Sequence, residues 1–196
     1  ASFKTNTECY ATEFKLFPEK FILKSYIQIF TDPQFYTSIL YTLIIEVSVI
    51  VVGTLVASLA AFAFAKLKMK GRKTLLLVLM SSMMVPYAAV MLPQYRVFQE
   101  LNMIETLWPL ILPGLFGNVS MMFFLITYMK SGITDSVIES AKIDGCSYLA
   151  MWKNIALPLA KPAIAAQAIF WFVGIWDDFF GPSIYLTNPK VQTLQV

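Results

Sequence analysis

The 196-residue sequence predicts an all-α integral membrane protein, folded as a polytopic helical bundle. Hydrophobic residues make up 58% of the chain, charged residues only 14%, and the mean hydropathy is +0.66, values outside the usual range of soluble domains. Apolar stretches also approach the roughly 20 residues that a helix needs to cross a bilayer core about 30 Å thick. Most of the chain is therefore expected to lie in a membrane.

Four stretches qualify as membrane spans, at residues 39–65, 74–93, 108–129 and 161–186. The third opens with Trp108-Pro109, which suits an interfacial anchor followed by the first turn of a helix. Prolines and glycines recur within the second and third spans: Pro86, Pro93, Pro109, Pro113, Gly114 and Gly117. They predict kinked helices, which transporters use more often than static membrane anchors do.

Small residues recur at every fourth position of the first span, at Gly53, Ala57, Ala61 and Ala65. This spacing places them on one helix face, where a second helix can approach closely. A chance pattern in an alanine-rich helix is the alternative. We favour helix packing.

The connection 66–73 sets the predicted orientation, because it carries basic residues and no acid: Lys66, Lys68, Lys70, Arg72 and Lys73. Such a run favours the cytoplasmic side. Residues 94–107 carry Arg96 against two glutamates and are predicted to lie outside. Residues 130–160 then return to the cytoplasm.

This alternation divides the chain into three parts. Residues 39–186 form the membrane domain, whereas 1–38 and 187–196 are predicted to be extracytoplasmic. Since residues 1–38 contain no export signal, we expect a further helix before residue 1 and another after residue 196.

Several function classes are disfavoured by what the sequence lacks. With no histidine, the chain offers no His-based catalysis and no His metal site. Cys9 and Cys146 are predicted to be free thiols on opposite membrane faces. No phosphate-binding G-x-x-x-x-G-K-[ST] sequence occurs, and the basic residues are too dispersed for a nucleic-acid surface. We therefore expect a non-enzymatic protein without a metal, a cofactor or a nucleic-acid partner.

A charged insert lies between the third and fourth spans. Residues 133–143 predict a short amphipathic helix, with Ser136 and Glu139 as a capping box and with Val137, Ile138 and Ala141 on one face. Asp144-Gly145 is the predicted stop, and a second segment, 148–155, is predicted to end at Pro158. Periodicity alone does not separate a rigid knob from an ordinary helical loop.

The insert resembles the EAA motif of permease subunits in binding-protein-dependent ABC importers. The matching positions are Glu139, Ala141, Gly145, Ile155, Leu157 and Pro158. The segments "AKIDGCS" and "LPLAKPAIAAQAIFWFVGIWDDFFGP" are similar to the maltose and multiple-sugar branch, and the resemblance extends over nearly the whole chain. Ser140 replaces the usual second alanine, and Asp177 replaces a common asparagine.

The resemblance implies spans two to five of a six-span permease core in a bacterial inner membrane, with a cytoplasmic coupling helix. It implies carbohydrate import with a second permease, two cytoplasmic ATPase subunits that bind the ATP, and an extracellular solute-binding protein. Glu139 is then expected to make an electrostatic contact with an ATPase, Ala141 and Gly145 a close approach, and Leu157-Pro158 a rigid return to the membrane. The full set of expected coupling residues is Glu139, Ser140, Ala141, Asp144, Gly145, Ile155, Leu157 and Pro158.

Acidic residues inside predicted spans are functional candidates, because a membrane charge is costly. We place Trp176, Asp177 and Asp178 beside the translocation path, where an aromatic face and carboxylates suit sugar hydroxyls. In the alternative interpretation they bond backbone groups freed by Gly181-Pro182. Glu46 is predicted to be interfacial. A secondary transporter driven by an ion gradient would also explain the acids, but it leaves the EAA-like pattern without a role.

Overall fold

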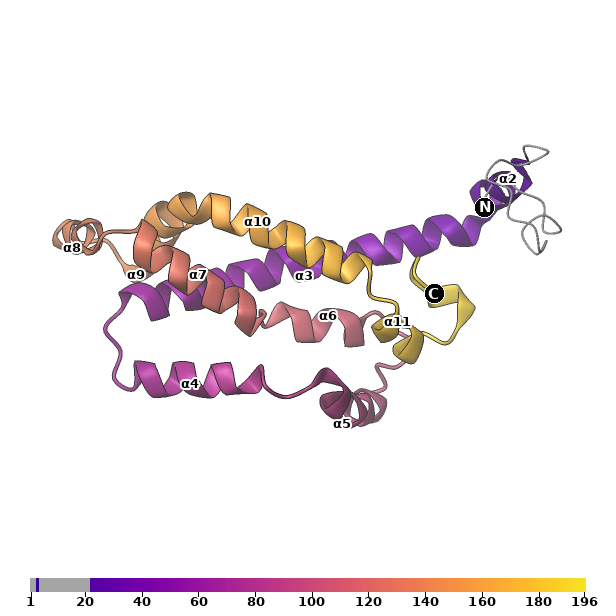
Figure 1. The fold of residues 1–196 in the computed structure, drawn as a ribbon, viewed down its shortest axis with the longest axis horizontal. Helices are drawn as coiled ribbons and strands as arrows, with labels where there is room; N and C mark the ends of the chain where they lie inside the picture. The colour runs from indigo at the N-terminus through magenta and orange to yellow at the C-terminus, as the bar shows by residue number, and fades with distance from the viewer. Residues whose placement is uncertain (1–2, 4–21) are drawn as a thin grey trace, which may run out of the picture.

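The computed structural model describes Phe3 and residues 22–196, and every regular element in that part of the chain is a helix. The predicted all-α membrane bundle is confirmed: three helical runs are long and apolar enough to cross a membrane, or four with one bent pair. Figure 1 shows the three runs lying along the long axis of the molecule, whereas the second half of the bent pair turns across it. Cys9 and most of the predicted N-terminal segment lie outside the described residues.

The first span is α3 (Pro33–Lys66), which follows the short helix α2 (Lys24–Thr31). Asp32 begins α3 by accepting a 2.9 Å hydrogen bond from the Gln34 backbone N–H, and Pro33 occupies the first turn, where no N–H is needed. At 1.5 Å per residue its 34 residues extend about 51 Å. The helix therefore begins earlier than the predicted span 39–65.

The small-residue face of α3 is buried, which confirms the packing prediction. Ala57 and Ala61 are at most 2% exposed. A side chain at Gly53 would collide with the Trp171 ring and with the Gly114 carbonyl oxygen, at 2.5 Å. The glycine therefore allows α3 to contact both the third and the fourth span closely.

The second predicted span is two helices, α4 (Arg72–Ser82) and α5 (Tyr87–Glu100), related by a bend of 89°. Pro86 precedes α5 and cannot continue the hydrogen-bond ladder of α4, because it has no backbone N–H. The predicted kink is present, but it is a full break, so residues 74–93 are not one helix.

The third span is also interrupted, between α6 (Trp108–Leu115) and α7 (Val119–Gly132). Gly117 takes a left-handed conformation there, with φ of 83°. Asn118 then caps α7 by accepting a 2.8 Å hydrogen bond from the Ser120 N–H. Together the two helices form a 25-residue apolar run.

The fourth span begins before its predicted start and ends before its predicted end. α9 (Tyr148–Met151), a π-helical turn η1 (Trp152–Ala156) and α10 (Leu157–Trp176) form one 29-residue run. Pro158 does not end the helix as predicted, because the wide π turn just before it accommodates the proline ring and its missing N–H. Beyond Trp176 the helix 161–186 is not continuous: α11 (Phe180–Tyr185) and the 3-10 turn η2 (Pro189–Val191) follow.

The main apolar core lies where α3, α7 and α10 meet. Phe62, Leu125, Met129 and Ala156 are at most 1% exposed there. Large apolar side chains such as Leu77 and Phe170 face outward, as expected for surfaces that contact lipid.

At the other end of the bundle, the loop between α5 and α6 holds the C-terminal segment. Glu105 accepts hydrogen bonds from the Thr187 N–H at 3.2 Å, from the Asn188 N–H at 2.9 Å and from the Thr187 hydroxyl. These hydrogen bonds, that of the Thr187 hydroxyl above all, hold the pKa of the Glu105 carboxyl below its usual value. The same segment contacts α3 further along, where the Leu194 N–H donates a 3.1 Å hydrogen bond to the Thr42 hydroxyl.

Candidate functional site

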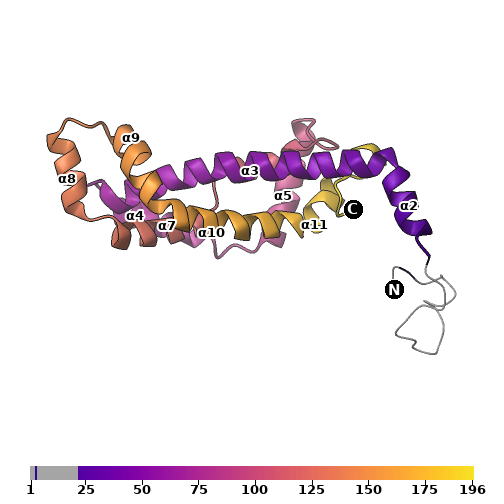
Figure 2. The ribbon, with the colours of Figure 1, turned by 90° about the horizontal axis from the view of Figure 1, so that it is seen from above.

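The charged insert forms a separate helix, α8 (Asp135–Ile143), at one end of the bundle. Figure 2 shows α8 lying across the direction of α3 and α10. Ile138 and Ala141 are buried at 3% and 6% exposure, and they attach α8 to the main core. Val137, the third residue of the predicted apolar face, is 41% exposed, so that face is only partly buried.

The predicted capping box is also wrong. The helix begins after Thr134, and no side chain caps its N-terminus. Ser136 lies within the first turn, and its hydroxyl is 3.1 Å from the Thr134 hydroxyl. A residue already inside the helix cannot act as its N-cap.

Gly145 ends α8 in the predicted manner. Its φ is 75°, its N–H donates to the Lys142 carbonyl at 3.1 Å, and the Cys146 N–H donates to the Ala141 carbonyl at 2.9 Å. These two bonds define a Schellman motif, which favours glycine. Apart from Gly145 and its two chain neighbours, no heavy atom of the described residues lies within 4 Å of the position that a Cβ would take at Gly145, and the free thiol of Cys146 is exposed. The outer side of the turn is therefore open in the described part of the chain.

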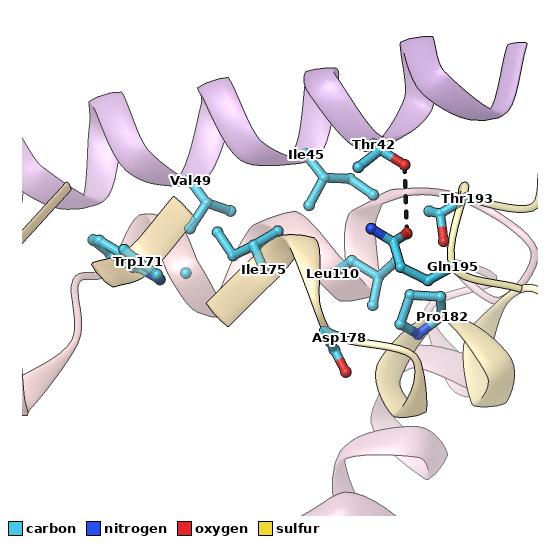
Figure 3. Close-up of a pocket in the computed structure, with 11 residues that line it drawn as sticks. Thr42, Ile45, Val49, Leu110, Trp171, Ile175, Asp178, Pro182, Thr193 and Gln195 are labelled. Carbon is cyan, nitrogen blue, oxygen red and sulfur yellow. Dashed lines mark hydrogen bonds between the residues drawn. The ribbon is translucent and has the colours of Figure 1, made fainter. Parts of the chain in front are cut away.

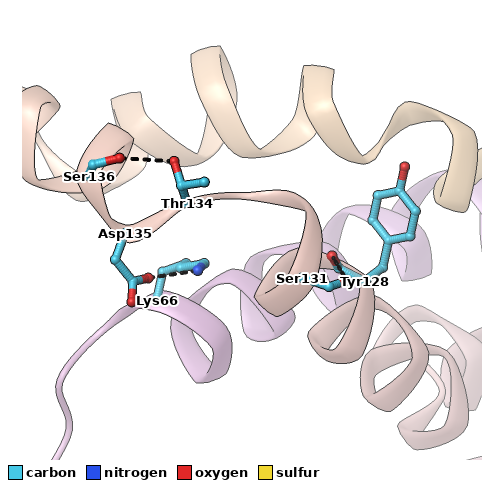
Figure 4. A network of polar contacts seen from close by, with 6 residues as sticks. All are labelled: Lys66, Tyr128, Ser131, Thr134, Asp135 and Ser136. Atoms are coloured by element: carbon cyan, nitrogen blue, oxygen red, sulfur yellow. Dashed lines mark hydrogen bonds and ion pairs between the residues drawn. The ribbon is translucent and has the colours of Figure 1, made fainter.

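Two polar contacts join the insert to α3. Lys66 Nζ lies 2.7 Å from Asp135 Oδ1, an ion pair drawn in Figure 4. The Lys66 side chain is only 4% exposed, whereas that of Asp135 is 83% exposed. The hydrogen bond and the charge of Lys66 hold the pKa of the Asp135 carboxyl below its usual value. At the other end of the insert, Trp152 Nε1 donates to Ser58 Oγ at 3.3 Å.

The expected coupling residues fall into two groups. Glu139, Ser140, Asp144 and Gly145 are exposed on α8 and its terminal turn, and Ala141 is buried beneath them. Ile155, Leu157 and Pro158 lie apart from these, at the base of the insert, in the helical run that continues into the fourth span. The contacts of Lys66, Asp135, Ser58 and Trp152 were not predicted; only the position of Lys66, at the start of the basic run, hinted at them.

At the opposite end of α10, the predicted translocation residues occupy a break between helices. Asp177 ends α10 and is exposed. Asp178 Oδ1 accepts a 3.0 Å hydrogen bond from the Gly181 N–H, the type of contact that the structural interpretation expects. The Trp176 ring stacks on Phe172, with centroids 5.6 Å apart.

A cavity of about 140 Å³ lies beside this break, between α3, α6, α10 and the C-terminal segment (Figure 3). Its polar lining consists of Thr42, Asp178, Thr193 and Gln195, and Trp171 supplies an aromatic face. Trp176 and Asp177 do not line it. Of the three predicted residues, the structure brings only Asp178 to the cavity.

Some of the polar groups that line this cavity have hydrogen-bond partners within the chain, and others do not. Gln195 Nε2 donates to the Trp176 carbonyl at 2.7 Å, and the Thr42 hydroxyl lies 3.5 Å from Gln195 Oε1. The hydroxyl of Thr193 is buried without a hydrogen-bond partner among the described residues. Thr42 could have been suspected as a polar residue within an apolar span, but no sequence signal pointed to Thr193 or Gln195.

Glu46 is buried within the bundle instead of facing an interface. Its side chain is 1% exposed, and neither carboxylate oxygen has a hydrogen-bond partner in the part of the chain that the structure describes. An unpaired buried carboxylate is costly in apolar surroundings, so Glu46 is a further candidate for a functional role.

Comparison with known proteins agrees with this architecture. Residues 50–196 match the family described as "Binding-protein-dependent transport system inner membrane component". Protein LplC of Bacillus subtilis (strain 168) is 35% identical over 195 residues, covering 100% of this chain and 65% of LplC. The polygalacturonan/rhamnogalacturonan transport system permease protein YtcP of the same organism is 32% identical over 196 residues, covering 100% of this chain and 67% of YtcP. The chain thus spans about two thirds of the length of these curated relatives.

The fold is also that of a solved structure, a bacterial ABC transporter involved in the import of the acidic polysaccharide alginate. The TM-score is 0.86 at 22% identity, and the match covers 100% of this chain and 68% of that one. The family match, the two relatives and the membrane-spanning helices agree with one another. This chain therefore belongs to the binding-protein-dependent transport system inner membrane components, the permease family of ABC importers.

Proposed function

We propose that this chain forms part of the membrane pathway of an ATP-driven importer that moves a carbohydrate from an extracellular binding protein into the cytoplasm. In this proposal a second permease completes the pathway, and two cytoplasmic ATPases bind and hydrolyse the ATP. The chain itself is non-catalytic. The observation that carries the proposal is the position of α8, which projects from the bundle with an open turn at Gly145 and is tied to α3 by Lys66 and Asp135.

The insert is suited to transmit movement. Ile138 and Ala141 fix α8 to the core, and the Lys66–Asp135 ion pair fixes its first turn to α3. Packed elements move as units instead of deforming continuously, so a force applied at the exposed face of α8 reaches the spans. Glu139, Ser140, Asp144 and Gly145 are the residues that we propose contact the ATPase, and Leu157-Pro158 passes the movement to α10.

A carbohydrate cargo is supported by the names of relatives and by the chemistry near the α10 break. YtcP is named for polygalacturonan and rhamnogalacturonan transport, and a relative from Halalkalibacterium halodurans is named for arabinooligosaccharides. Carboxylate, amide and hydroxyl groups beside an aromatic ring match the hydroxyls and apolar faces of sugars. We propose that Asp178 contacts the passing cargo and that Trp176 and Asp177 lie along the same route.

One observation favours a second candidate, transport driven by an ion gradient. The buried and unpaired carboxyl of Glu46 is the kind of group that secondary transporters use to bind ions. This alternative gives no role to α8 and its open turn.

Uptake by the full-length permease, reconstituted with its partner subunits in vesicles, distinguishes ATP-driven import from transport driven by an ion gradient. Labelled oligosaccharides from pectin and arabinan are suitable probes. ATP-dependent uptake that vanadate inhibits and an uncoupler leaves intact is expected. Uptake abolished by the uncoupler alone would instead establish the ion-gradient mechanism.

A further inference from the structure

A second recess lies beneath α8. The proposed function uses Lys66, Asp135 and Glu139 of its lining but assigns no ligand to the recess itself. The recess has a volume of about 420 Å³ and lies between the end of α3, the following loop, the end of α7 and α8. Its charged lining consists of Lys66, Lys68, Arg72, Lys130, Lys142, Asp135 and Glu139. Five basic side chains thus face two carboxylates.

The basic groups in this recess are not all paired. Lys66 is engaged with Asp135, and Lys142 Nζ lies 5.8 Å from the centre of the Tyr148 ring. The side chains of Lys68, Arg72 and Lys130 make no hydrogen bond or ion pair with any residue that the structure describes. The excess positive charge is therefore available to an anion.

The ends of three helices surround the recess. α3 ends at Lys66, α4 begins at Arg72 and α7 ends at Gly132, and each of these helices belongs to a candidate membrane-spanning segment. Lipid phosphates lie at the level where spans end. The recess, which these three helix ends surround, is therefore expected at the level of the lipid phosphates.

An apolar surface adjoins the recess. None of the residues of α4 is buried, and Leu75, Leu77 and Val78, in its first two turns, are 52–68% exposed. A free phosphate makes no contact with an apolar surface. A phospholipid does, because its acyl chains can lie along α4 while its phosphate enters the recess.

We propose that this recess binds the headgroup phosphate of an anionic membrane phospholipid. Lys68 and Lys130 supply point charges, and Arg72 supplies the planar fork that bonds two phosphate oxygens together. A lipid held here would touch α3, α7 and α8 at once and would stabilise their arrangement at the base of α8. The inference requires only that the chain is a membrane protein, so it does not depend on coupling to ATP.

The test uses the full-length permease in lipid nanodiscs, with labelled phosphatidylglycerol as the probe and phosphatidylcholine as the uncharged comparison. The variant Lys68→Gln/Lys130→Gln removes two charges from the recess. Lys70→Gln/Lys73→Gln removes two charges from the neighbouring surface, in the loop and in the first turn of α4, outside the recess, and is the matched control. We expect the recess variant to retain phosphatidylglycerol about tenfold less tightly, and the control to lie within about twofold of wild type.

Equal losses in both variants would mean that general surface charge attracts the lipid, and the proposal would fail. If inorganic phosphate by itself displaced the labelled phosphatidylglycerol, the acyl chains would contribute nothing to binding. The recess would then be a site for a soluble anion, and the lipid proposal would fail. If lipid retention were unchanged but association with the ATPase weakened, the recess would be a protein contact. The charge-keeping variant Lys68→Arg/Lys130→Arg checks folding, since it must bind as wild type does; loss of binding there would also overturn the proposal.

Discussion

The indole Nε1 of Trp152 donates a 3.3 Å hydrogen bond to the hydroxyl of Ser58, and it thereby joins the π-helical turn of the insert to the C-terminal half of α3. The two residues are 94 positions apart in sequence. Ser58 is fully buried and also donates to the Leu55 carbonyl at 2.9 Å. Together with the Lys66–Asp135 ion pair, this bond attaches both ends of the insert to one helix.

Replacing Trp152 with Phe removes the indole N–H and keeps an aromatic side chain. We expect a loss of about 1 kcal/mol in stability, the usual net contribution of one hydrogen bond. Ser58→Ala is the partner variant in a double-mutant cycle measured by thermal unfolding in detergent. The double variant is expected to be about as stable as either single variant; strictly additive losses would mean that the bond contributes nothing.

The Lys66–Asp135 pair predicts a dependence of stability on pH. Because the folded-state pKa of Asp135 is lowered, the pair stabilises the fold above the ordinary carboxyl pKa of about 3.9 and loses its effect as pH falls through the lower folded value. Asp135→Asn should therefore flatten the fall of the melting temperature between about pH 5 and pH 2 relative to wild type. Identical pH profiles for the two proteins would contradict this role.

Gly145 and Gly71 allow a matched test of the proposed coupling turn. Both have φ of 75°, and beyond its chain neighbours neither has a heavy atom within 4 Å of the position that a Cβ would take. A side chain therefore costs similar backbone strain at each, about 1–2 kcal/mol. We expect Gly145→Trp to abolish uptake while ATP hydrolysis by the complex continues uncoupled. Gly71→Trp is the control and should retain coupled uptake. Normal uptake by Gly145→Trp would contradict the proposed contact between this turn and the ATPase.

Two variants of Asp178 distinguish a structural role of this residue from contact with the cargo. Asp178→Asn keeps an oxygen that can accept the Gly181 N–H but loses the charge, whereas Asp178→Ala loses both. If the carboxylate contacts cargo, uptake by Asp178→Asn should fall about tenfold, equivalent to about 1.4 kcal/mol, at an unchanged melting temperature. If Asp178→Asn kept full uptake and only Asp178→Ala lost it, Asp178 would act only by accepting the hydrogen bond at the start of α11.

Replacing Glu46 with Leu tests whether its burial has a function. Removing an unpaired buried carboxyl from an apolar interior should raise the melting temperature, because no favourable contact is lost. Uptake driven by ATP is expected to persist. Loss of uptake in a stabilised Glu46→Leu protein would support the ion-gradient alternative.

The sequence by itself determined the features that depend on local composition and spacing. Apolar length predicted the membrane bundle, the four-residue repeat from Gly53 to Ala65 predicted the close contact face of α3, and Asp144-Gly145 predicted the end of α8. Each of these follows from the chain's own periodicity or from the conformational freedom of glycine.

The tertiary structure decided where helices continue or break. Pro158 looked like a terminator, yet the helix continues through a π turn that sequence periodicity does not reveal, and at Pro86 the predicted kink is a bend of 89° between two separate helices. It also decided which distant groups meet: Ser58 with Trp152, Lys66 with Asp135, and Thr42 with Gln195. Such contacts depend on the relative placement of packed helices, which is set by side-chain fit over the whole bundle and not by any one segment.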